Sequence, residues 1–216
     1  MSGKSLHFIR QPELPADIRI AVRWRQNDTL PLNSMDSGRE RERREGRQLI
    51  KDAISEYLGT GHLTIRTEEG GKPHARLDDQ PVHISISHNP LMICGVISPH
   101  RSVGVDLESI RRDVHPGLKR RISHPSEVER VHELPALQLW TLKEAALKWC
   151  GSGLRTAMNR VCVVDARNPF FRLQLPDKRV VSLYSLRFED HWLSVAYSAD
   201  SGSASGEKFL VTGEEL

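Results

Sequence analysis

The order of strand-like and helix-like segments is the sequence feature that most constrains the fold. Residues 18–24 (IRIAVRW) alternate apolar and polar side chains, which is typical of a half-buried strand. Apolar side chains then recur at helical spacing from Leu49 to Leu58, and Gly59 and Gly61 end this predicted helix. Three further strands are predicted, at residues 63–66, 82–87 and 91–98.

The same order then begins again. VGVDL at residues 103–107 predicts a strand, and residues 126–133 and 136–150 predict two helices. Four more strands are predicted, at residues 160–165, 170–175, 180–188 and 192–198. The repeat lies in the order of elements and not in residue identity. It predicts an α+β fold, a pseudo-dimer of two similar α/β halves with a small-molecule site in the cleft between them.

We expect the first half to span residues 1–101 and the second half, which carries the predicted metal site, to span residues 102–199. Residues 200–216 are rich in Ser and Gly and are expected to be a disordered tail.

The composition narrows the class of protein. With 216 residues, 38% of them hydrophobic and 27% charged, the chain can bury the core of one large domain or two small ones. No apolar run approaches the roughly 20 residues of a membrane span, and the start of the sequence lacks the apolar segment of a secretion signal. Cys94, Cys150 and Cys162 are widely spaced and are expected to be buried, reduced thiols. These features favour a cytoplasmic protein without a membrane partner.

The net charge of +3 is less informative than its distribution. The basic run at residues 39–47 (RERERREGR) is interleaved with three glutamates, so a solvated helix face explains it as well as an anion site does. The segment at residues 111–121 carries five basic side chains against Asp113 alone. It is the better candidate to face an anionic partner.

The motif GVDLE places two carboxylates, Asp106 and Glu108, on one face of a predicted strand, about 6–7 Å apart along the backbone. Edge-strand carboxylates that face water are the alternative, but the apolar Val103, Val105 and Leu107 favour an interior strand. Buried carboxylates need a cation or a basic partner. Two or three carboxylate ligands are typical of a Mg²⁺ site.

The later motif WTLKEAALKWCGSGL places Glu144 and Lys148 one turn apart on a predicted helix, with Trp140 one turn earlier. A surface ion pair is the alternative interpretation. If this face looks into the cleft, Glu144 can join the two acids at a metal ion and Lys148 can reach a phosphate. Gly151 and Gly153 end the helix and allow a ligand or another chain to approach closely.

Two weaker signals precede these motifs. SISHN puts Ser87 and His88 at the end of a predicted strand, where a phosphate could bind, although a lone histidine is more often structural. EEGGKP puts Lys72 and Pro73 in a predicted exposed loop, a weak phosphate-binding signal because such turns are common.

Taken in order, GKP, ISH, GVDLE and W-x-x-KEA-x-x-K-x-x-G-x-GL resemble the 4′-phosphopantetheinyl transferase superfamily, in its longer monomeric type exemplified by the surfactin-synthetase activator. The motifs cover about residues 71–154, and the element order extends the resemblance to roughly residues 18–198. The resemblance implies a pseudo-dimer with coenzyme A between its halves. It also implies the reaction: the serine hydroxyl of an apo acyl or peptidyl carrier protein attacks the β-phosphorus of coenzyme A, and 3′,5′-ADP leaves.

The resemblance assigns roles to the residues of the two strong motifs. It implies that Asp106 and Glu108 bind Mg²⁺. Glu144 is then a third metal ligand or the base that acts on the carrier serine, and Lys148 contacts the pyrophosphate. His88 is expected to contact a phosphate group and to complete the catalytic set with Glu144 and Lys148.

Further cofactor-binding residues follow from the weaker motifs. Lys72 and Pro73 are expected to line the nucleotide site, and Ser87 to lie at the phosphates beside its neighbour. Basic residues near the first long helix bind the 3′-phosphate in the family. Arg47 is the best-placed candidate here, with Arg43 and Arg44 as alternatives.

Two departures leave the carrier open. RRISHPSEV stands where family members commonly have aromatic residues before S-x-x-E, and KEA stands where many members of this type have KES. Neither departure removes a chemical group that the reaction needs. The carrier could therefore belong to fatty-acid, polyketide or peptide synthesis.

A metal-dependent nuclease is the main alternative, because an Asp-x-Glu strand with a later Glu and Lys also suits phosphodiester hydrolysis, and basic runs could hold nucleic acid. Such nucleases usually place the acid and the lysine two apart on one strand, and they leave ISH and GKP unexplained. A non-catalytic binding module would be expected to lack one of the acids, and all three are present. We therefore expect coenzyme A and a carrier protein as partners, no nucleic acid, and a monomer.

Overall fold

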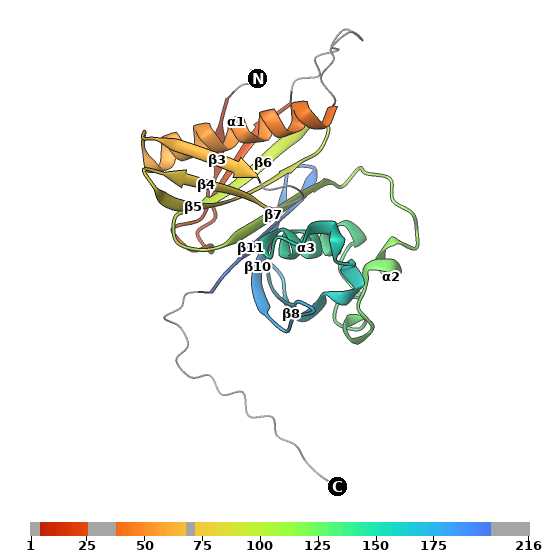
Figure 1. Cartoon of the computed structure of the whole chain (residues 1–216). Helices are drawn as coiled ribbons and strands as arrows, with labels where there is room; N and C mark the ends of the chain where they lie inside the picture. Colours follow the sequence, from red (N-terminus) through yellow and green to blue (C-terminus); the bar gives the residue numbers. More distant parts are fainter. Residues whose placement is uncertain (1–4, 26–37, 68–71, 200–216) are drawn as a thin grey trace.

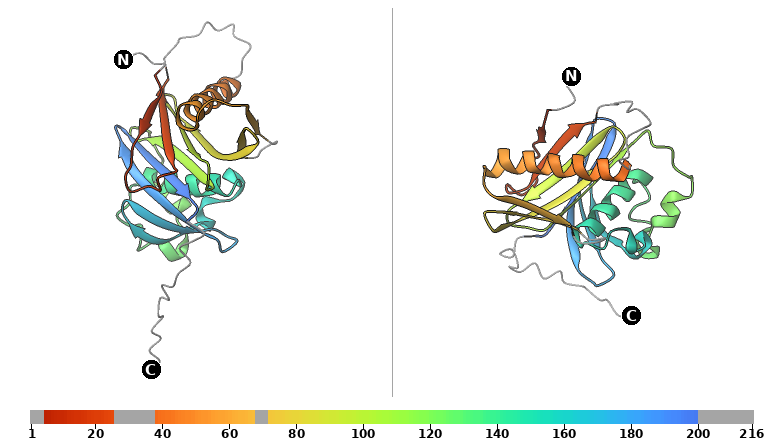
Figure 2. Two further views of the ribbon diagram at one scale, coloured as in Figure 1. Left: turned by 90° about the vertical axis from the view of Figure 1, so that its left-hand side faces the viewer. Right: turned by 45° about the horizontal axis from the view of Figure 1, so that its top comes forward.

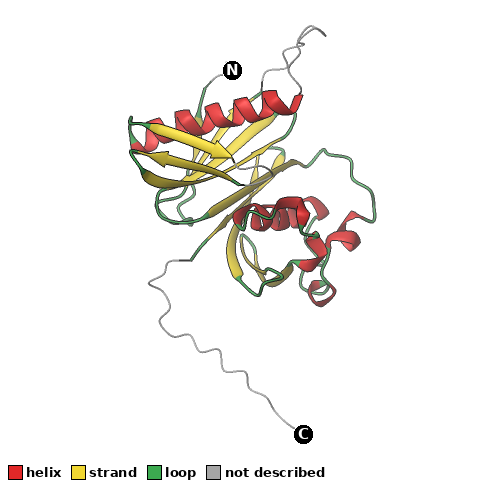
Figure 3. Cartoon of the chain, in the orientation of Figure 1, coloured by secondary structure: helices red, strands yellow, loops and turns green. Residues whose placement is uncertain are grey.

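A computed structural model of the chain describes residues 5–25, 38–67 and 72–199. Within these residues two antiparallel sheets are each packed against a helix (Figures 1 and 3). The predicted α+β class is confirmed. In the described ranges no helix is both long enough and apolar enough to cross a membrane. The predicted disordered tail, residues 200–216, lies outside the described residues.

The first sheet is built from residues before position 99 and has the strand order β1-β2-β6-β5-β4-β3. Its strands are β1 (His7–Ile9), β2 (Arg19–Trp24), β6 (Met92–Ser98), β5 (Gln80–His88), β4 (Pro73–Leu77) and β3 (Leu63–Thr67). Helix α1 (Gly38–Leu58) lies across this sheet (Figure 2). Its side chains Leu49, Ile50 and Ile54 are fully buried there, which the helical spacing of these residues predicted.

The second sheet uses residues after position 102 and has the order β7-β11-β10-β9-β8. Its strands are β7 (Val103–Ser109), β11 (His191–Tyr197), β10 (Val180–Phe188), β9 (Phe170–Gln174) and β8 (Cys162–Arg167). Helix α3 (Ala136–Trp149) packs on this sheet through a buried apolar cluster that includes Leu139, Leu142 and Ala146. Short helical turns connect these elements, namely α2 (Leu118–Ile122), η1 (Pro125–Glu127), η2 (Gly153–Arg155) and η3 (Met158–Arg160).

The two sheets share a third apolar cluster. Ile20 and Met92 of the first sheet are buried together with Val105, Leu107 and Val195 of the second. Strand β7 is an edge strand of its own sheet, yet its outer edge is not open to water. Instead, β5 lies against it, and β5 serine hydroxyls accept hydrogen bonds from two β7 peptide N–H groups. The strand that carries the GVDLE motif is therefore at the junction of the two sheets.

A glycine lies where each long helix crosses its sheet. A Cβ atom added to Gly95 in β6 would lie 2.8 Å from Ile50 Cδ1 of α1. A Cβ atom added to Gly104 in β7 would lie 2.2 Å from the Ala145 carbonyl oxygen and 2.5 Å from the Trp149 nitrogen. The glycine of GVDLE thus lets α3 approach the strand closely, which brings the later motif over the earlier one.

Most predicted strands are confirmed, but four elements differ from the prediction. The predicted helix at residues 126–133 is wrong, since only the single turn Pro125–Glu127 is helical and the following residues form turns. The Glu127 side chain accepts hydrogen bonds from the His124 and Val163 peptide N–H groups, which fixes this segment as a tight turn. The strands β1 and β4 and the short helix α2 were not predicted.

Candidate active site

The site is built on β7 and on the face of α3 that crosses it. Asp106 and Glu108 alternate with apolar residues, so both side chains lie on the face of β7 that α3 covers. Asp106 is buried, with 4% of its surface exposed, and Glu108 and Glu144 are half-buried. The expectation that these carboxylates are not simply edge-strand groups facing water is met, although β7 is an edge strand.

Lys148 connects the helix to the strand. Its Nζ donates to Asp106 Oδ1 over 2.8 Å and to Ser87 Oγ over 3.1 Å. The lysine therefore forms its ion pair across two elements, with an acid of β7. This arrangement follows from one helical turn between Glu144 and Lys148 and from the glycine that admits α3 to the strand.

The three acids influence one another's protonation. Burial raises the pKa of Glu144 to about 7; Lys148 lowers this pKa, while Asp106 and Glu108 raise it. Burial and the charge of Asp106 also raise the pKa of Glu108, and Arg112 and Lys148 oppose this rise. Burial is the main cause of both pKa shifts, and repulsion from the neighbouring acids adds to it.

Arg112 also belongs to the site, although the sequence analysis did not identify it as a partner of the acids. Its guanidinium pairs with the Glu108 carboxylate and lies over the Trp140 ring, 5.1 Å from the centroid. The signal was present in the sequence, since Arg112 follows Glu108 by four residues just after the strand. It was assigned instead to a basic surface segment.

Two observations bear on a metal ion at this site. Asp106 Oδ2 and Glu144 Oε2 are buried and have no hydrogen-bond partner among the described residues. Unpaired carboxylate oxygens of this kind fit a hard divalent cation. However, Lys148 forms an ion pair with Asp106, and Arg112 forms one with Glu108. In the described ranges no group of three His, Cys, Asp or Glu side chains is arranged as a metal centre. The donor atoms fit Mg²⁺, and the two basic side chains would have to give way to it.

The sequence predicted an exposed loop at Lys72, but in the structure this residue is half-buried. Its Nζ donates to Ser102 Oγ, to the Val103 carbonyl at 2.5 Å and to the Trp149 carbonyl at 3.1 Å. All three ammonium protons are thus used to tie the start of β4 to β7 and to the end of α3. Burial lowers the pKa of Lys72 to about 8. Its neighbour Pro73 begins β4.

A pocket of about 230 Å³ lies beside these groups. It is lined by Lys72, Pro73, Ser85, Ile86, Lys148, Gly151 and Gly153, so it includes residues from before β7 and from after it. Both glycines have positive φ, 76° and 50°, which lets the chain leave α3 in a tight turn along the pocket wall. Five of the residues that the sequence motifs selected therefore line one cavity together with two residues of β5.

His88 and Arg47 lie on the side of the site that α1 borders. His88 Nε2 lies 2.7 Å from Glu42 Oε2 of α1. Arg47, also on α1, is exposed and approaches Thr67 Oγ1 at 3.5 Å. Arg43 and Arg44 are likewise exposed, so the structure does not separate the three arginines as anion ligands.

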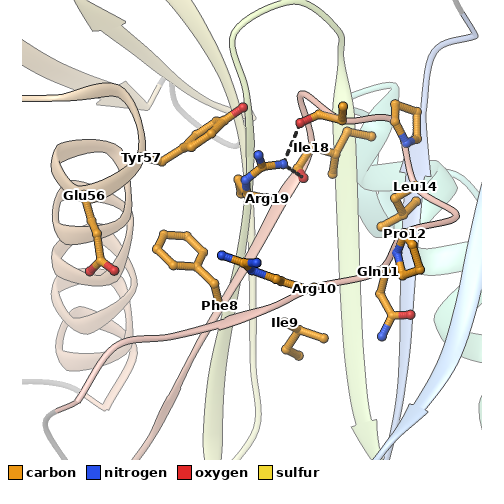
Figure 4. A pocket seen from close by; sticks show the side chains of 12 residues that line it. Phe8, Ile9, Arg10, Gln11, Pro12, Leu14, Ile18, Arg19, Glu56 and Tyr57 are labelled. Atoms are coloured by element: carbon orange, nitrogen blue, oxygen red, sulfur yellow. Dashed lines mark hydrogen bonds between the residues drawn. The ribbon is translucent and has the colours of Figure 1, made fainter.

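Figure 4 shows a second and larger pocket, of about 630 Å³, between the β1–β2 region and the end of α1. Arg10 and Arg19 both line it, and the Arg19 guanidinium donates to the Ala16 and Ile18 carbonyls and lies 4.3 Å from the centroid of the Tyr57 ring. No residue that the sequence motifs selected lines this pocket. The chemistry-bearing motifs therefore point to the smaller pocket.

Comparisons with known proteins agree with this site. Residues 102–198, which contain the three acids and Lys148, match the family model of the 4′-phosphopantetheinyl transferase superfamily. Over these residues the chain is similar to that superfamily. The match covers the second sheet and helix α3, which carry GVDLE and KEA.

Two curated phosphopantetheinyl transferases are similar to the chain. The 4′-phosphopantetheinyl transferase psf-1 of Bacillus pumilus is 28% identical over 153 residues, which cover 65% of this chain and 64% of the relative. The 4′-phosphopantetheinyl transferase gsp of Aneurinibacillus migulanus is 27% identical over 123 residues, covering 53% of this chain and 50% of the relative. The matched part of the chain thus spans less than two thirds of either relative's length.

Proposed function

We propose that this chain transfers the 4′-phosphopantetheine group of coenzyme A to a serine of an apo acyl or peptidyl carrier protein and releases 3′,5′-ADP. The observation that carries the proposal is the Asp106–Lys148 contact of 2.8 Å, which joins the two strong motifs beside a pocket. The superfamily match and the names of the two relatives support it. No observation favours a nuclease.

In this proposal Asp106, Glu108 and Glu144 hold Mg²⁺, which when bound would neutralise charge on the pyrophosphate. The unpaired oxygens of Asp106 and Glu144 support the assignment. Arg112 and Lys148 then exchange their carboxylate partners for other anions. Both side chains are partly exposed, which leaves them free to move.

The remaining roles follow from position. Lys148 lines the pocket, so its ammonium group can turn from Asp106 to a phosphate oxygen and stabilise the negative charge of the departing 3′,5′-ADP. The alternative role for Glu144, in place of metal ligand, is that of base: its Oε2 has no hydrogen-bond partner among the described residues and would accept the proton of the carrier serine as the serine oxygen bonds to the β-phosphorus. His88 and Arg47, on the α1 side, would contact the outer phosphates, and Lys72 and Pro73 would form one wall of the nucleotide site.

Ser87 was also expected to bind the cofactor. Its hydroxyl has three protein partners, which are Asp106, Leu107 and Lys148. We further propose that residues 1–101 and 102–199 act as the two halves of a pseudo-dimer in one monomeric chain, with coenzyme A between them. The division of the strands into two sheets at this point in the chain supports that proposal.

The test is intact-mass analysis of apo carrier proteins from fatty-acid, polyketide and peptide synthesis, incubated with the chain, coenzyme A and Mg²⁺. We expect at least one carrier to gain the mass of a single phosphopantetheine group, and its Ser→Ala variant to gain none. If no carrier gained mass while a reference transferase modified the same panel, the proposal would be wrong.

A further inference from the structure

Ser87 lies where β5 meets the edge of β7, and its hydroxyl group is fully used. Its Oγ lies 2.8 Å from Asp106 Oδ1, 3.2 Å from the Leu107 nitrogen and 3.1 Å from Lys148 Nζ. A peptide N–H and an ammonium group can only donate. The hydroxyl oxygen must therefore accept from both, and its single proton is directed to Asp106.

This arrangement fixes the Asp106 carboxylate. Oδ1 accepts from Ser87 and from Lys148, while Oδ2 is buried and has no partner among the described residues. Rotation of the carboxylate would break both hydrogen bonds to Oδ1. Oδ2 is therefore presented as the open donor atom before any ligand binds.

The two partners of Oδ1 differ in mobility. The Lys148 side chain is 24% exposed and lines the pocket, where a phosphate would compete for its ammonium group. Ser87 is only 3% exposed, and its short side chain is held by the β7 backbone. When Lys148 turns toward an anion, Ser87 is the partner that stays on Asp106.

We propose that Ser87 is a positioning residue that sets the orientation of Asp106 for a divalent cation, and that it is not a ligand of the phosphates. The inference rests on the proposed function, because the cation is the one assigned there to Asp106. Hydrogen-bond partners behind a metal ligand typically contribute 10- to 100-fold to metal affinity. Ser87 is expected to act on this scale.

Ser85 provides a matched control on the same strand. Its hydroxyl accepts from the Val105 N–H at 3.0 Å, and the residue is also 3% exposed. Ser85 thus makes the same junction between β5 and β7 as Ser87 does, but no hydrogen bond joins it to Asp106. Substitution by alanine at the two positions separates the effect on the sheet junction from the effect on the carboxylate.

The experiment measures Mn²⁺ binding to the full chain without coenzyme A, by titration calorimetry or electron paramagnetic resonance. We expect Ser87→Ala to raise the Mn²⁺ dissociation constant about 10- to 100-fold, and Ser85→Ala to leave it at the wild-type value. Both variants should melt at a lower temperature than the wild type, because each loses a buried hydrogen bond to the β7 backbone, and the loss should be larger in Ser87→Ala, whose hydroxyl also contacts Asp106 and Lys148.

Three results would overturn the inference. Unchanged Mn²⁺ affinity in Ser87→Ala, or an equal loss in Ser85→Ala, would show that the Asp106 contact does not set the metal site. Weaker binding of 3′,5′-ADP to Ser87→Ala in EDTA, with Mn²⁺ affinity intact, would make Ser87 a phosphate ligand. A wild-type chain that bound no Mn²⁺ would overturn the metal assignment of the proposed function as well, which the other two results leave standing.

Discussion

At the scale of single residues, cations and acids are matched in pairs around β7. Lys148 lies on Asp106 and Arg112 lies on Glu108, so the two β7 carboxylates are neutralised while Glu144 keeps an unpaired oxygen. Removing one acid relieves repulsion among the remaining two, because Asp106 raises the pKa of both Glu108 and Glu144. Repulsion among the acids therefore opposes folding, and Lys148 and Arg112 offset part of it.

Asp106→Asn tests this balance with little change of shape. We expect phosphopantetheine transfer to be lost with Mg²⁺ present, and the thermal unfolding temperature without metal to change little, since the amide still accepts from Ser87. EDTA should abolish transfer by the wild-type chain. Substantial transfer by Asp106→Asn, or by the wild type in EDTA, would contradict the metal assignment. Asp190→Asn, which alters an exposed pair with Arg111, is the control.

His191 gives a separate prediction, on pH. Its ring is buried against the edge of Trp24, and neither ring nitrogen has a hydrogen-bond partner among the described residues. Burial lowers the pKa of His191 from its ordinary 6.5, although Glu189 and Asp190 oppose the shift. As the pH falls through 6.5, the unfolded chain binds a proton that the folded chain does not, so the free energy of unfolding decreases.

His191→Phe keeps a ring against Trp24 and removes this proton. Urea unfolding between about pH 7.5 and pH 5.5 should therefore show a smaller loss of stability in the variant than in the wild type. His100→Gln, at an exposed histidine, should behave as the wild type does. An identical loss in His191→Phe and the wild type would show that His191 titrates normally in the folded chain.

At the scale of elements, α3 presents two lysines to quite different surroundings. Lys148 faces β7 and the pocket, whereas Lys143 is fully buried. Lys143 Nζ donates to Glu127 Oε1 at 2.5 Å and to the Ile122 and Val161 carbonyls, both at 2.7 Å. Five residues apart on a helix, the two lysines point about 140° apart around its axis, so they meet different surroundings.

Substitution should separate these two lysines. Lys143→Ala leaves Glu127 buried without its partner and should lower the free energy of unfolding by about 3–5 kcal/mol. Lys148→Ala should stay folded and should weaken coenzyme A binding. Denaturant unfolding and calorimetry measure the two effects. If Lys143→Ala remained as stable as the wild type, the buried ion pair would not support the fold. If Lys148→Ala bound coenzyme A normally, the assignment of Lys148 to the coenzyme A site would be wrong.

The elements show where sequence reasoning succeeds. Strands such as β7 and β11 were predictable because β-branched and apolar side chains alternate over their length. Strand β4 (PHARL) offers no such run, and β1 has only three residues. Lys72 could not have been placed by pattern, since its partners are groups of residues 102, 103 and 149, which only the tertiary fold brings to it. The acids and Lys148 were found because their spacing matches the strand and helix periods.

At the scale of the whole molecule, the basic side chains of the segment at residues 111–121 differ in whether they are already paired within the chain. Arg111 pairs with Asp190, Arg112 pairs with Glu108, and Ile122 at its end is buried and unavailable as an apolar contact. Arg120 and Arg121 on α2 are exposed, and no ion pair holds them within the described residues. These two arginines are the part of the segment free to attract an acidic carrier.

Reversing both charges (Arg120→Glu with Arg121→Glu) should raise the KM for the carrier and flatten its dependence on salt, since exposed charges act over about 8–10 Å. The KM for coenzyme A should stay at the wild-type value. Arg187→Glu, at an exposed arginine of β10, is the control. Equal changes in both KM values would assign the segment to the nucleotide site or to the fold.

The apolar cluster shared by the two sheets determines what would happen if the chain were cut. A break in the connection between β6 and β7, at residues 99–102, would leave each fragment with a water-exposed face of Val, Ile and Leu. Neither fragment would be soluble alone, and their complementary faces would favour reassembly. Fused to two proteins that bind each other, the fragments would regain the proposed transferase activity only when those proteins met. The junction thus makes the chain suited to a split reporter of protein proximity.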